Sequence, residues 1–502
     1  HAGKRHRSVG GPATRTVRLH RFSILEIICD TILQIVMSPA EVDLPFDLPF
    51  DPAHSRRTLL KSAACGFGGL ALSSFASQSP RIVPRAKRII FLFMQGGPSQ
   101  VDTYDYKPEL TKGHEKKVNF YVPRTRQNEE RELMKSFWEF KQYGECGRWS
   151  SSLFPEVAKH VDDLCFIHSM HTEGVAHGPA TLFLHTGATN LVRPSVGAWI
   201  SYGLGSGNSN LPAFVTVNPP ANKGGPRNWG NAFLPASTQG TVLGQAGNPN
   251  AKPEIRNLVS PVGSEEAKRE HEFLKRLNQV QRGNSEQRLV DGMIASHELA
   301  WRMQTHAADL INIDKESRQT RELYGIGDDA TDGFGRQCLA ARQLAESGVR
   351  FIQVSHCDNK STPVWDQHNN MPKHEPLAGQ VDRPIAGLLT DLKRRGLLED
   401  TLVWWGSEFG RTPFTQNNLG RDHNPRGFTT WLAGGGVKPG FAYGSTDEFG
   451  FQAVENKVHM HDLHATLLHL LGLDHEQLTY RYAGRDFRLT DVHGHVVKDI
   501  LA

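Results

Sequence analysis

The sequence predicts an α/β fold in which helices cover both faces of a largely parallel sheet. Short apolar runs such as RIIFLFM at 88–94 are continuous rather than alternating, which is typical of strands buried on both faces. These runs alternate along the chain with amphipathic helical patterns. We therefore expect a three-layer α/β/α sandwich.

Each element has its own signal. The expected strands are RIIFLFM, VRFIQVSHCD, TLVWWGSEFG and FTTWLAGGG, at 88–94, 349–358, 401–410 and 428–436. The segment 381–400 predicts a helix because Ile385, Leu388 and Leu392 recur on one face, and Gly396 marks its C-terminal end. The segment 461–473 predicts a second amphipathic helix.

The composition argues against several classes of protein, namely those that bind nucleic acid or anionic membranes and those built on a disulfide scaffold. Of 502 residues, 38% are hydrophobic and 22% are charged, which is ordinary for a globular protein. The first 36 residues hold six Lys/Arg against two Asp/Glu and account for the net charge of +4. The remaining chain is close to neutral, which argues against nucleic acid or an anionic membrane as a partner. The cysteines contain no C-x-x-C, so neither a zinc knuckle nor a disulfide scaffold is indicated.

The front of the chain predicts export. The pair Arg56-Arg57 precedes a Gly/Ala/Leu-rich stretch that ends at a small-x-small cleavage site at Ala76, so residues 37–76 resemble a twin-arginine signal region. The alternative is a short buried helix after a chance arginine pair. The apolar run is too short for a permanent membrane span. We expect a periplasmic or extracellular protein.

The rest of the chain divides as follows. The chain begins with His1, and Met37 opens a polar lead into the signal, so 1–36 is expected to be a non-native upstream extension. Residues 77–87 form a linker, and 88–502 form the main domain. Within it, the Gly-, Asn- and Pro-rich part of 205–324 and its charged helical part are expected to be an insertion that caps one end of the sheet.

Acids and histidines follow the expected strands. In α/β sheets, ligands bind outside the carboxyl ends of the strands, so these side chains are expected to meet. The residues are Asp102 and Asp105, then His356, Asp358, Asp366 and His368, and finally Glu408, Asp422 and His423. Unpaired, they would lose several kcal/mol on desolvation, whereas a divalent metal ion is ligated by these groups.

Each member also has a simpler explanation. Asp102 could cap the helix after the turn. Asp366 could form an Asx-turn, and Glu408 could pair with Arg411. His368 and His423 could be ordinary surface histidines.

Several long motifs resemble one family. The segments GGPSQVDTYDYKPEL, HSMHTEGVAHGPATLFLHTG, RRGLLEDTLVWWGSEFGRTP and GRDHNPRGFTTWLAGGGVKPG are similar to those of bacterial exported, sulfatase-like proteins catalogued as domain of unknown function 1501. The order of acids and histidines resembles the alkaline phosphatase superfamily, which includes the sulfatases. The resemblance implies an alkaline phosphatase-like sandwich with loop-rich and helical cap insertions.

The resemblance also implies a ligand set. The expected metal ligands are Asp102, Asp366, His368, Glu408 and His423. Asp366 and His368 are two residues apart, whereas the superfamily pair is usually four apart. Phe409 stands where the superfamily often has a histidine, which argues against a full two-metal site.

The resemblance leaves three candidates for the nucleophile. In sulfatases a modified Cys lies nine residues before a Thr-Gly, and counting back from Thr186 gives His177. Ser169 and Thr172 lie nearby and are further candidates. His177 could instead be a metal ligand, or it could indicate that the chemistry is lost.

Two functions follow from these observations. The first is an exported, metal-dependent hydrolase of sulfate or phosphate esters, with Ca, Zn, Mn or Mg as its ion. Its substrate would be a small anionic ester, with sulfated carbohydrate among the candidates. The alternative is a catalytically degenerate extracytoplasmic binding protein that keeps the fold and the metal site.

Overall fold

The computed structural model describes residues 82–502, except 123–124, 249, 255–263, 282–286 and 307–311. The upstream extension, the signal region and residues 77–81 of the linker expected from the sequence lie outside the described residues. Among the helices of the described part, none combines the length and apolar character that a membrane span requires.

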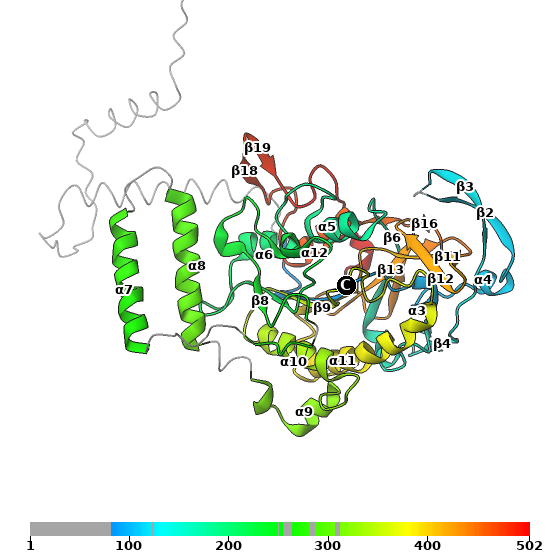
Figure 1. Ribbon diagram of the computed structural model, residues 1–502, viewed down its shortest axis with the longest axis horizontal. Helices are drawn as coiled ribbons and strands as arrows, with labels where there is room; N and C mark the ends of the chain where they lie inside the picture. The colour runs from blue at the N-terminus through cyan, green and yellow to red at the C-terminus, as the bar shows by residue number, and fades with distance from the viewer. Residues whose placement is uncertain (1–81, 123–124, 249, 255–263, 282–286, 307–311) are drawn as a thin grey trace, which may run out of the picture. The chain divides into compact units, whose positions relative to one another are not determined.

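A nine-stranded sheet forms the centre of the described chain (Figure 1). Its order is β14 (Phe441–Tyr443), β6 (Leu164–His171), β13 (Phe428–Ala433), β10 (Thr401–Gly406), β1 (Arg88–Met94), β9 (Phe351–His356), β7 (Phe214–Val217) and β8 (Thr241–Leu243), and β17 (Val458–His459) also pairs with β6. Within this sheet, β13 is antiparallel to both of its neighbours, and every other pairing is parallel. The predicted largely parallel sheet is confirmed.

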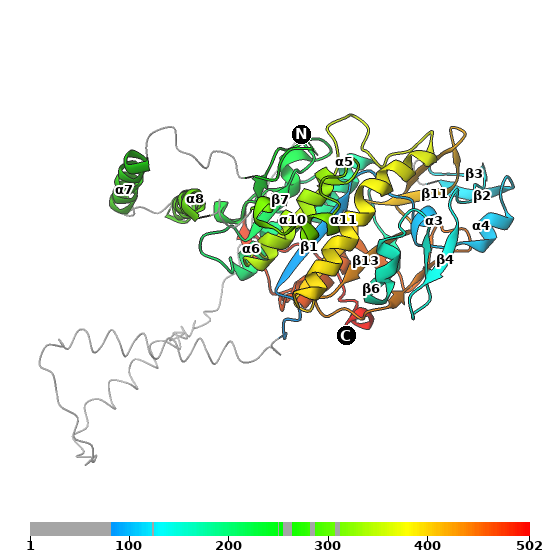
Figure 2. The ribbon, with the colours of Figure 1, turned by 90° about the horizontal axis from the view of Figure 1, so that it is seen from below.

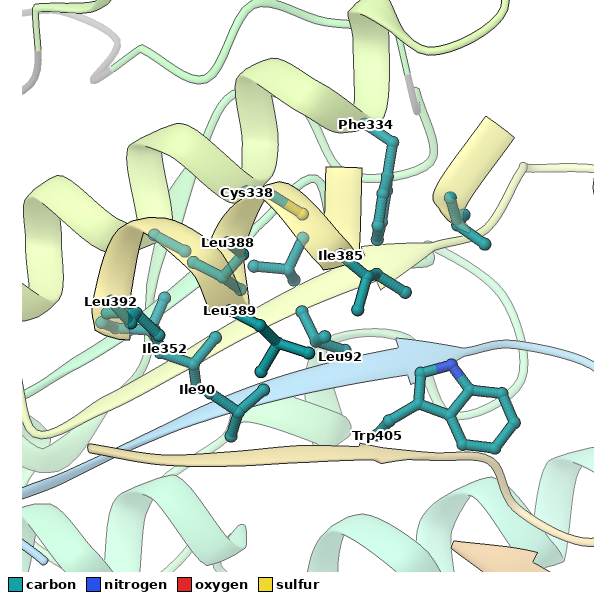
Figure 3. Close-up of a cluster of buried hydrophobic side chains, with 14 of the residues drawn as sticks. Ile90, Leu92, Phe334, Cys338, Ile352, Ile385, Leu388, Leu389, Leu392 and Trp405 are labelled. Atoms are coloured by element: carbon teal, nitrogen blue, oxygen red, sulfur yellow. The ribbon is translucent and has the colours of Figure 1, made fainter. Parts of the chain in front are cut away.

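The apolar run of strand β1 is continuous because both faces of the strand are buried. Ile90, Leu92 and Met94 pack on one face of the sheet, whereas Ile89, Phe91 and Phe93 pack on the other. The first face lies under α10 (Asp332–Glu346) and α11 (His374–Arg394), which cross the strands in Figure 2. Figure 3 shows Leu388 and Leu389 of α11 directed at this face.

The opposite face is covered by α5 (His177–Thr186), α6 (Val196–Leu204) and α12 (Met460–Leu470). Phe183, Trp199 and Leu467 of these helices share one buried cluster with Phe91 and Trp404 of the sheet. The Phe91 and Trp404 rings stack at 3.6 Å. Helices therefore cover both faces, and the three-layer α/β/α class is confirmed.

The element bounds differ from the expected ones at several ends. Helix α11 begins at His374, seven residues earlier than expected, and contains Pro384. The expected strand at 401–410 ends at Gly406, and a separate strand starts at Gly410. Helix α12 runs from Met460 to Leu470. The apolar patterns located these elements but did not fix their ends.

The segment 205–324 requires a correction. It is not only an insertion, because β7 and β8 within it belong to the central sheet and pair in parallel with β9 and with each other. Its charged part is helical as expected and forms α7 (Ser264–Gln281) and α8 (Gln287–His306). The His271 ring of α7 stacks on Trp301 of α8 at 4.6 Å. The expected cap over one end of the sheet stays a prediction.

Several short elements lie beyond the β6 and β13 side of the sheet in Figures 1 and 2. They are α3 (Gln100–Thr103), α4 (Pro108–Lys112), and the paired strands β2 (Lys117–Val122) with β3 (Gln127–Glu132), β4 (Phe140–Tyr143) with β5 (Arg148–Ser151), and β11 (Gly410–Gln416) with β12 (Gly420–Asn424). The remaining helix and strands are α9 (Arg318–Leu323), β15 (Ser445–Thr446), β16 (Ala453–Glu455), β18 (Tyr480–Tyr482) and β19 (Arg485–Phe487). The β11–β12 hairpin carries part of the site described next.

Candidate metal centre

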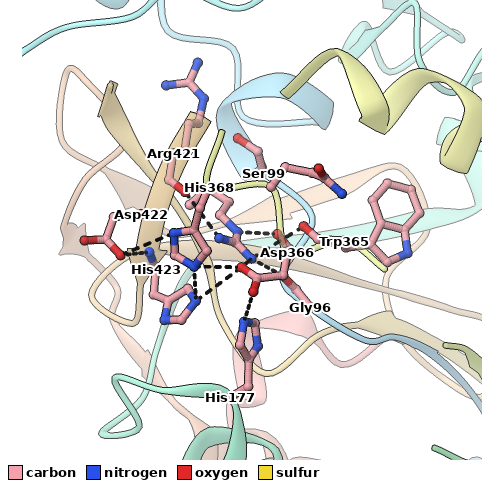
Figure 4. Close-up of polar contacts among 12 residues, drawn as sticks. Gly96, Ser99, His177, Trp365, Asp366, His368, Arg421, Asp422 and His423 are labelled. Atoms are coloured by element: carbon pink, nitrogen blue, oxygen red, sulfur yellow. Dashed lines mark hydrogen bonds and ion pairs between the residues drawn. The ribbon is translucent and has the colours of Figure 1, made fainter. Parts of the chain in front are cut away.

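Four side chains from three separate parts of the chain converge at one edge of the sheet (Figure 4). His177 is the first residue of α5, Asp366 and His368 follow β9, and His423 lies on β12. One ligand atom from each of the four lies within 4.8 Å of all the others. Among the described residues, this is the group of His, Cys, Asp and Glu with the geometry to hold a metal ion.

Asp366 is at the centre of the group. His177 Nε2 lies 3.1 Å from its Oδ2, and His368 Nε2 lies 2.9 Å from its Oδ1. His423 Nε2 is 3.4 Å from the same Oδ1, and 3.0 Å from His368 Nε2. The Nε2 atoms of three imidazoles therefore face one carboxylate.

His177 is fixed through its other nitrogen. Its Nδ1 lies 2.6 Å from Glu408 Oε1, and an ionised carboxylate can only accept a hydrogen bond. Nδ1 therefore donates to Glu408, and in the neutral ring this leaves Nε2 to offer a lone pair to a cation. That Nε2 is buried and makes no hydrogen bond, although Asp366 lies beside it.

The other two imidazoles are fixed in the same way. His423 Nδ1 lies 3.0 Å from the carbonyl oxygen of Val175, and His368 Nδ1 contacts Gln416 Oε1. Both acceptors are oxygens, so each neutral ring can keep its proton on Nδ1 and present Nε2 to a cation at the centre.

This donor set fits a divalent cation. Three lone pairs and a carboxylate would repel one another unless positive charge lies between them. Burial alone would lower the pKa of His177, but Asp366 and Glu408 outweigh burial and raise it. The carboxylates therefore favour positive charge at this position. Imidazole Nε2 atoms whose Nδ1–H groups donate to oxygen are a common arrangement around protein-bound metals.

Arg411 forms an ion pair with Asp366. Its guanidinium is fully buried, lies 2.7 Å from Asp366 Oδ1, and also donates to the carbonyl oxygens of Gly96 and Gly97. Burial alone would raise the pKa of Asp366, but the three imidazoles and Arg411 hold that pKa far below its usual range. The carboxylate is therefore ionised and available as a ligand.

Glu408 supports the centre instead of belonging to it. It is fully buried and lies outside the group of four. Its carboxylate accepts from the Gly96 amide at 3.1 Å, from Ser407 Oγ at 2.6 Å and from His177. Burial alone would raise the pKa of Glu408, but the His177 imidazole outweighs burial and lowers it. The structure thus gives this expected ligand a different role, that of positioning His177.

Asp102 is also displaced from its expected role. Its carboxylate lies 2.7 Å from Arg421 Nε and accepts from Ser99 Oγ at 2.5 Å, and both charged side chains are fully buried. Arg421 satisfies its remaining donors on backbone carbonyls, including those of Thr412 and Met134. Asp102 therefore anchors the β11–β12 hairpin and does not reach the centre.

The candidate nucleophiles separate in the structure. His177 belongs to the group of four that could hold a metal ion, whereas Ser169 and Thr172 do not. Ser169 Oγ donates to the carbonyl oxygen of Asn456 at 2.6 Å. Thr172 is buried, and its backbone amide bonds the carbonyl oxygen of Pro425.

Two nearby features decide how the centre is enclosed. Phe409 lies against the rings of His177 and His423, at 4.9 and 4.4 Å between centroids, so it excludes water from one side of the centre. Gly96 has φ +116°, and a Cβ there would lie 2.8 Å from the Asp366 amide. A glycine is therefore required where the chain after β1 approaches the metal-ligating loop.

Sequence reasoning missed two contributors to the centre, Gln416 and the Val175 carbonyl, which carry no metal signature of their own. Arg411 was considered as a partner of Glu408, whereas in the structure it pairs with Asp366.

The chain matches one protein family and is similar to several solved structures. Residues 86–501 match the family described as Protein of unknown function (DUF1501). No curated protein matches the chain. Solved structures similar to it include the PsFucS1 sulfatase from Pseudoalteromonas sp., at 13% identity and a TM-score of 0.31, with 87% of this chain and 75% of that chain covered.

Two further structures are similar at the same level. The lipoteichoic acid synthase LtaP from Listeria monocytogenes has 8% identity and a TM-score of 0.34, covering 81% of this chain and 75% of that one. The alkaline phosphatase from the Antarctic bacterium TAB5 has 12% identity and a TM-score of 0.29, covering 71% and 94%. The fold class described above rests on the sheet order and its two helical layers, not on these likenesses.

Proposed function

The chain belongs to the DUF1501 family, and from that premise we propose that it is an exported, metal-dependent hydrolase of sulfate or phosphate esters. One observation carries the proposal. Three Nε2 lone pairs and the Asp366 carboxylate converge within 4.8 Å, and each imidazole is held in the required tautomer by an oxygen acceptor.

The donor set narrows the choice of ion. Ca²⁺ and Mg²⁺ prefer oxygen ligands, whereas imidazole suits Zn²⁺ and similar transition metals. His177, His368, His423 and Asp366 supply three nitrogens and one carboxylate. Of the ions expected from the sequence, we therefore favour Zn²⁺, with Mn²⁺ second.

The charge of the site suits an anionic ester. When bound, a divalent cation supplies Lewis acidity, which stabilises charge on an ester anion and acidifies water. The carboxylates of Asp366, Glu408 and Asp422, the last 3.9 Å from His368 Nδ1, would be balanced by Arg411 and a divalent cation together, so an anionic ester would not meet a net negative centre. Arg411 and Glu408 hold Asp366 and His177 in place, so little reorganisation is needed during a reaction.

Water is the proposed nucleophile. Ser169 donates its hydroxyl proton to Asn456, and neither Ser169 nor Thr172 belongs to the group of four. His177 directs its only free lone pair to the metal position. The partly exposed His368, at 28% of its side chain, lies on the side from which water and an ester could enter.

A second function is supported by the ligand count. Four protein ligands complete a tetrahedral ion, and closed sites of that kind are usually structural, whereas catalytic sites keep an open position. The alternative is therefore a metal-holding extracytoplasmic binding protein without turnover.

One experiment distinguishes the hydrolase from the binding protein. The purified chain would be assayed for metal by elemental analysis, then with aryl sulfate, phosphate mono- and diester and phosphonate substrates. We expect about one equivalent of Zn²⁺ or Mn²⁺ and hydrolysis that His423→Ala abolishes. Metal without turnover would favour the binding protein, and absence of metal would contradict both.

A further inference from the structure

A cavity of about 690 Å³ lies on the other side of the β11–β12 hairpin from the metal centre. Thr415 and Leu419 of the hairpin line it, whereas the adjacent Gln416 contacts the metal-ligating His368. The other walls come from the α3–α4 segment and from residues 134–140, which gather at the same end of the sheet in Figures 1 and 2. The volume is within the range of about 300–1,000 Å³ typical of ligand pockets.

Four aromatic rings line the cavity, those of Tyr106, Phe137, Trp138 and Phe140. Phe137 is 42% exposed, which is costly for a phenyl ring unless another surface covers it. Trp138 is backed by the ring of buried His374 at 6.4 Å. Tyr106 packs against Phe140 and Trp149, at 5.2 and 4.3 Å between ring centroids, so Phe137 is the most exposed of the four rings.

Buried contacts hold the cavity floor in place. Arg421 donates to the carbonyl oxygens of Met134 and Lys135 at 3.0 and 3.3 Å. The same guanidinium forms the buried ion pair with Asp102. The backbone that carries Phe137 and Trp138 is thus tied to the core, and the cavity is preformed for a ligand.

The charged side chains that line the cavity argue against a polyanionic ligand. Glu115, Glu132 and Glu139 line the cavity with Lys107 and Lys135. Lys107 is already ion-paired with Asp105 at 3.1 Å. Glu139 lies 4.0 Å from Lys141, so Glu115 and Glu132 still exceed the one remaining ammonium group, that of Lys135, and a polyanion would be repelled. Together these groups offer both donors and acceptors to a neutral ligand that is rich in hydroxyl groups.

We propose that this cavity binds a neutral glycan. The apolar faces of pyranose rings would stack on Phe137 and Trp138, and sugar hydroxyls would bond Glu132, Lys135 and Asn418. Aromatic faces flanked by alternating donors and acceptors match a sugar ring, which has apolar faces and a hydroxylated edge. The site is separate from the metal centre and does not depend on turnover there.

The test measures binding of cellohexaose, xylohexaose, maltohexaose and mannohexaose to the full metal-loaded chain by calorimetry. At least one is expected to bind, and Phe137→Ala should weaken that binding about tenfold or more, as for an aromatic anchor. Phe273→Ala is the matched control, because Phe273 is 65% exposed on α7 and outside the cavity. Trp138→Phe should retain most of the affinity.

Three outcomes would overturn the proposal. They are no binding of any of the four neutral hexasaccharides, equal affinity of the Phe137→Ala and Phe273→Ala variants, and tighter binding of a sulfated hexasaccharide than of every neutral one. Each variant's melting temperature would be measured first, so that a loss of affinity is not confused with unfolding. Because the readout is binding, its failure would leave the hydrolase proposal intact.

Discussion

Glu408 Oε1 lies 2.6 Å from Nδ1 of His177, a residue 231 positions earlier in the chain. This contact joins the end of β10 to the start of α5 and turns the His177 Nε2 lone pair to the metal position. An acid placed directly after a buried strand thus holds an imidazole in one orientation, and it does so without belonging to the ligand group itself.

Glu408→Gln should weaken metal binding without abolishing it. The carboxamide keeps the size of the side chain but removes the charge that fixes the His177 tautomer, and loss of such outer contacts typically costs about 10–100-fold in metal affinity. Competition with a chelator measures the effect. Glu399→Gln, at an exposed position, is the control. Affinity unchanged in both variants would refute the positioning role.

Asp366→Asn should remove the metal, whereas Asp102→Asn should retain it and lower stability. Asp102 pairs with fully buried Arg421, and breaking such a pair costs about 3–5 kcal/mol. Elemental analysis and denaturant unfolding measure the two effects. If Asp102→Asn loses the metal while its free energy of unfolding stays the same, Asp102 is a ligand after all.

Ser169→Ala and Thr172→Ala should leave turnover within about threefold of the wild type, because neither hydroxyl belongs to the metal-ligating group. His177→Ala should lose both metal and activity. Steady-state kinetics and metal content would be measured together. A loss of about a thousandfold in one hydroxyl variant that keeps its metal would identify a side-chain nucleophile and exclude attack by water.

Folding stability should fall steeply as the pH drops from 6.5 towards 4. Burial lowers the pKa of several histidines, to about 4 for His185, His356 and His464 and to about 3 for His461. In this pH range the unfolded chain binds more protons than the folded one, so stability is full above 6.5 and is lost as the pH falls through the folded values.

One buried acid opposes this trend. Burial raises the pKa of Asp382 to about 6, so this group binds its proton more tightly in the folded state and stabilises the fold at low pH. One carboxyl does not offset several imidazoles, and the net slope keeps its sign. Urea unfolding at pH 7, 6, 5 and 4 measures it, and a flat profile would contradict the prediction.

Export should depend on the paired arginines. A chain starting at Met37 and fused to a reporter should leave the cytoplasm, and changing Arg56 and Arg57 to Lys should retain it, because Lys lacks the guanidinium that a twin-arginine receptor recognises. Fractionation of the reporter measures the effect. Normal export of the double-Lys chain would remove the twin-arginine assignment.

Part of the candidate site followed from sequence order. The sequence predicts that Asp366, His368 and His423 meet because each comes after an expected strand, and the structure brings these three together. His177 was placed near the chemistry by its motif, but as a candidate nucleophile. Its place among the ligands depends on how α5 packs on the sheet, which no local pattern contains.

The sequence by itself determined the α/β class and the positions of the main strands and helices, because apolar periodicity is a local property of the chain. Only the tertiary structure decided that Asp102 pairs with Arg421, 319 residues away, and that Glu408 orients His177. A carboxylate after a strand can bind a metal, a guanidinium or an imidazole. The choice depends on which buried group lies within reach in space, and distant parts of the chain supply that group.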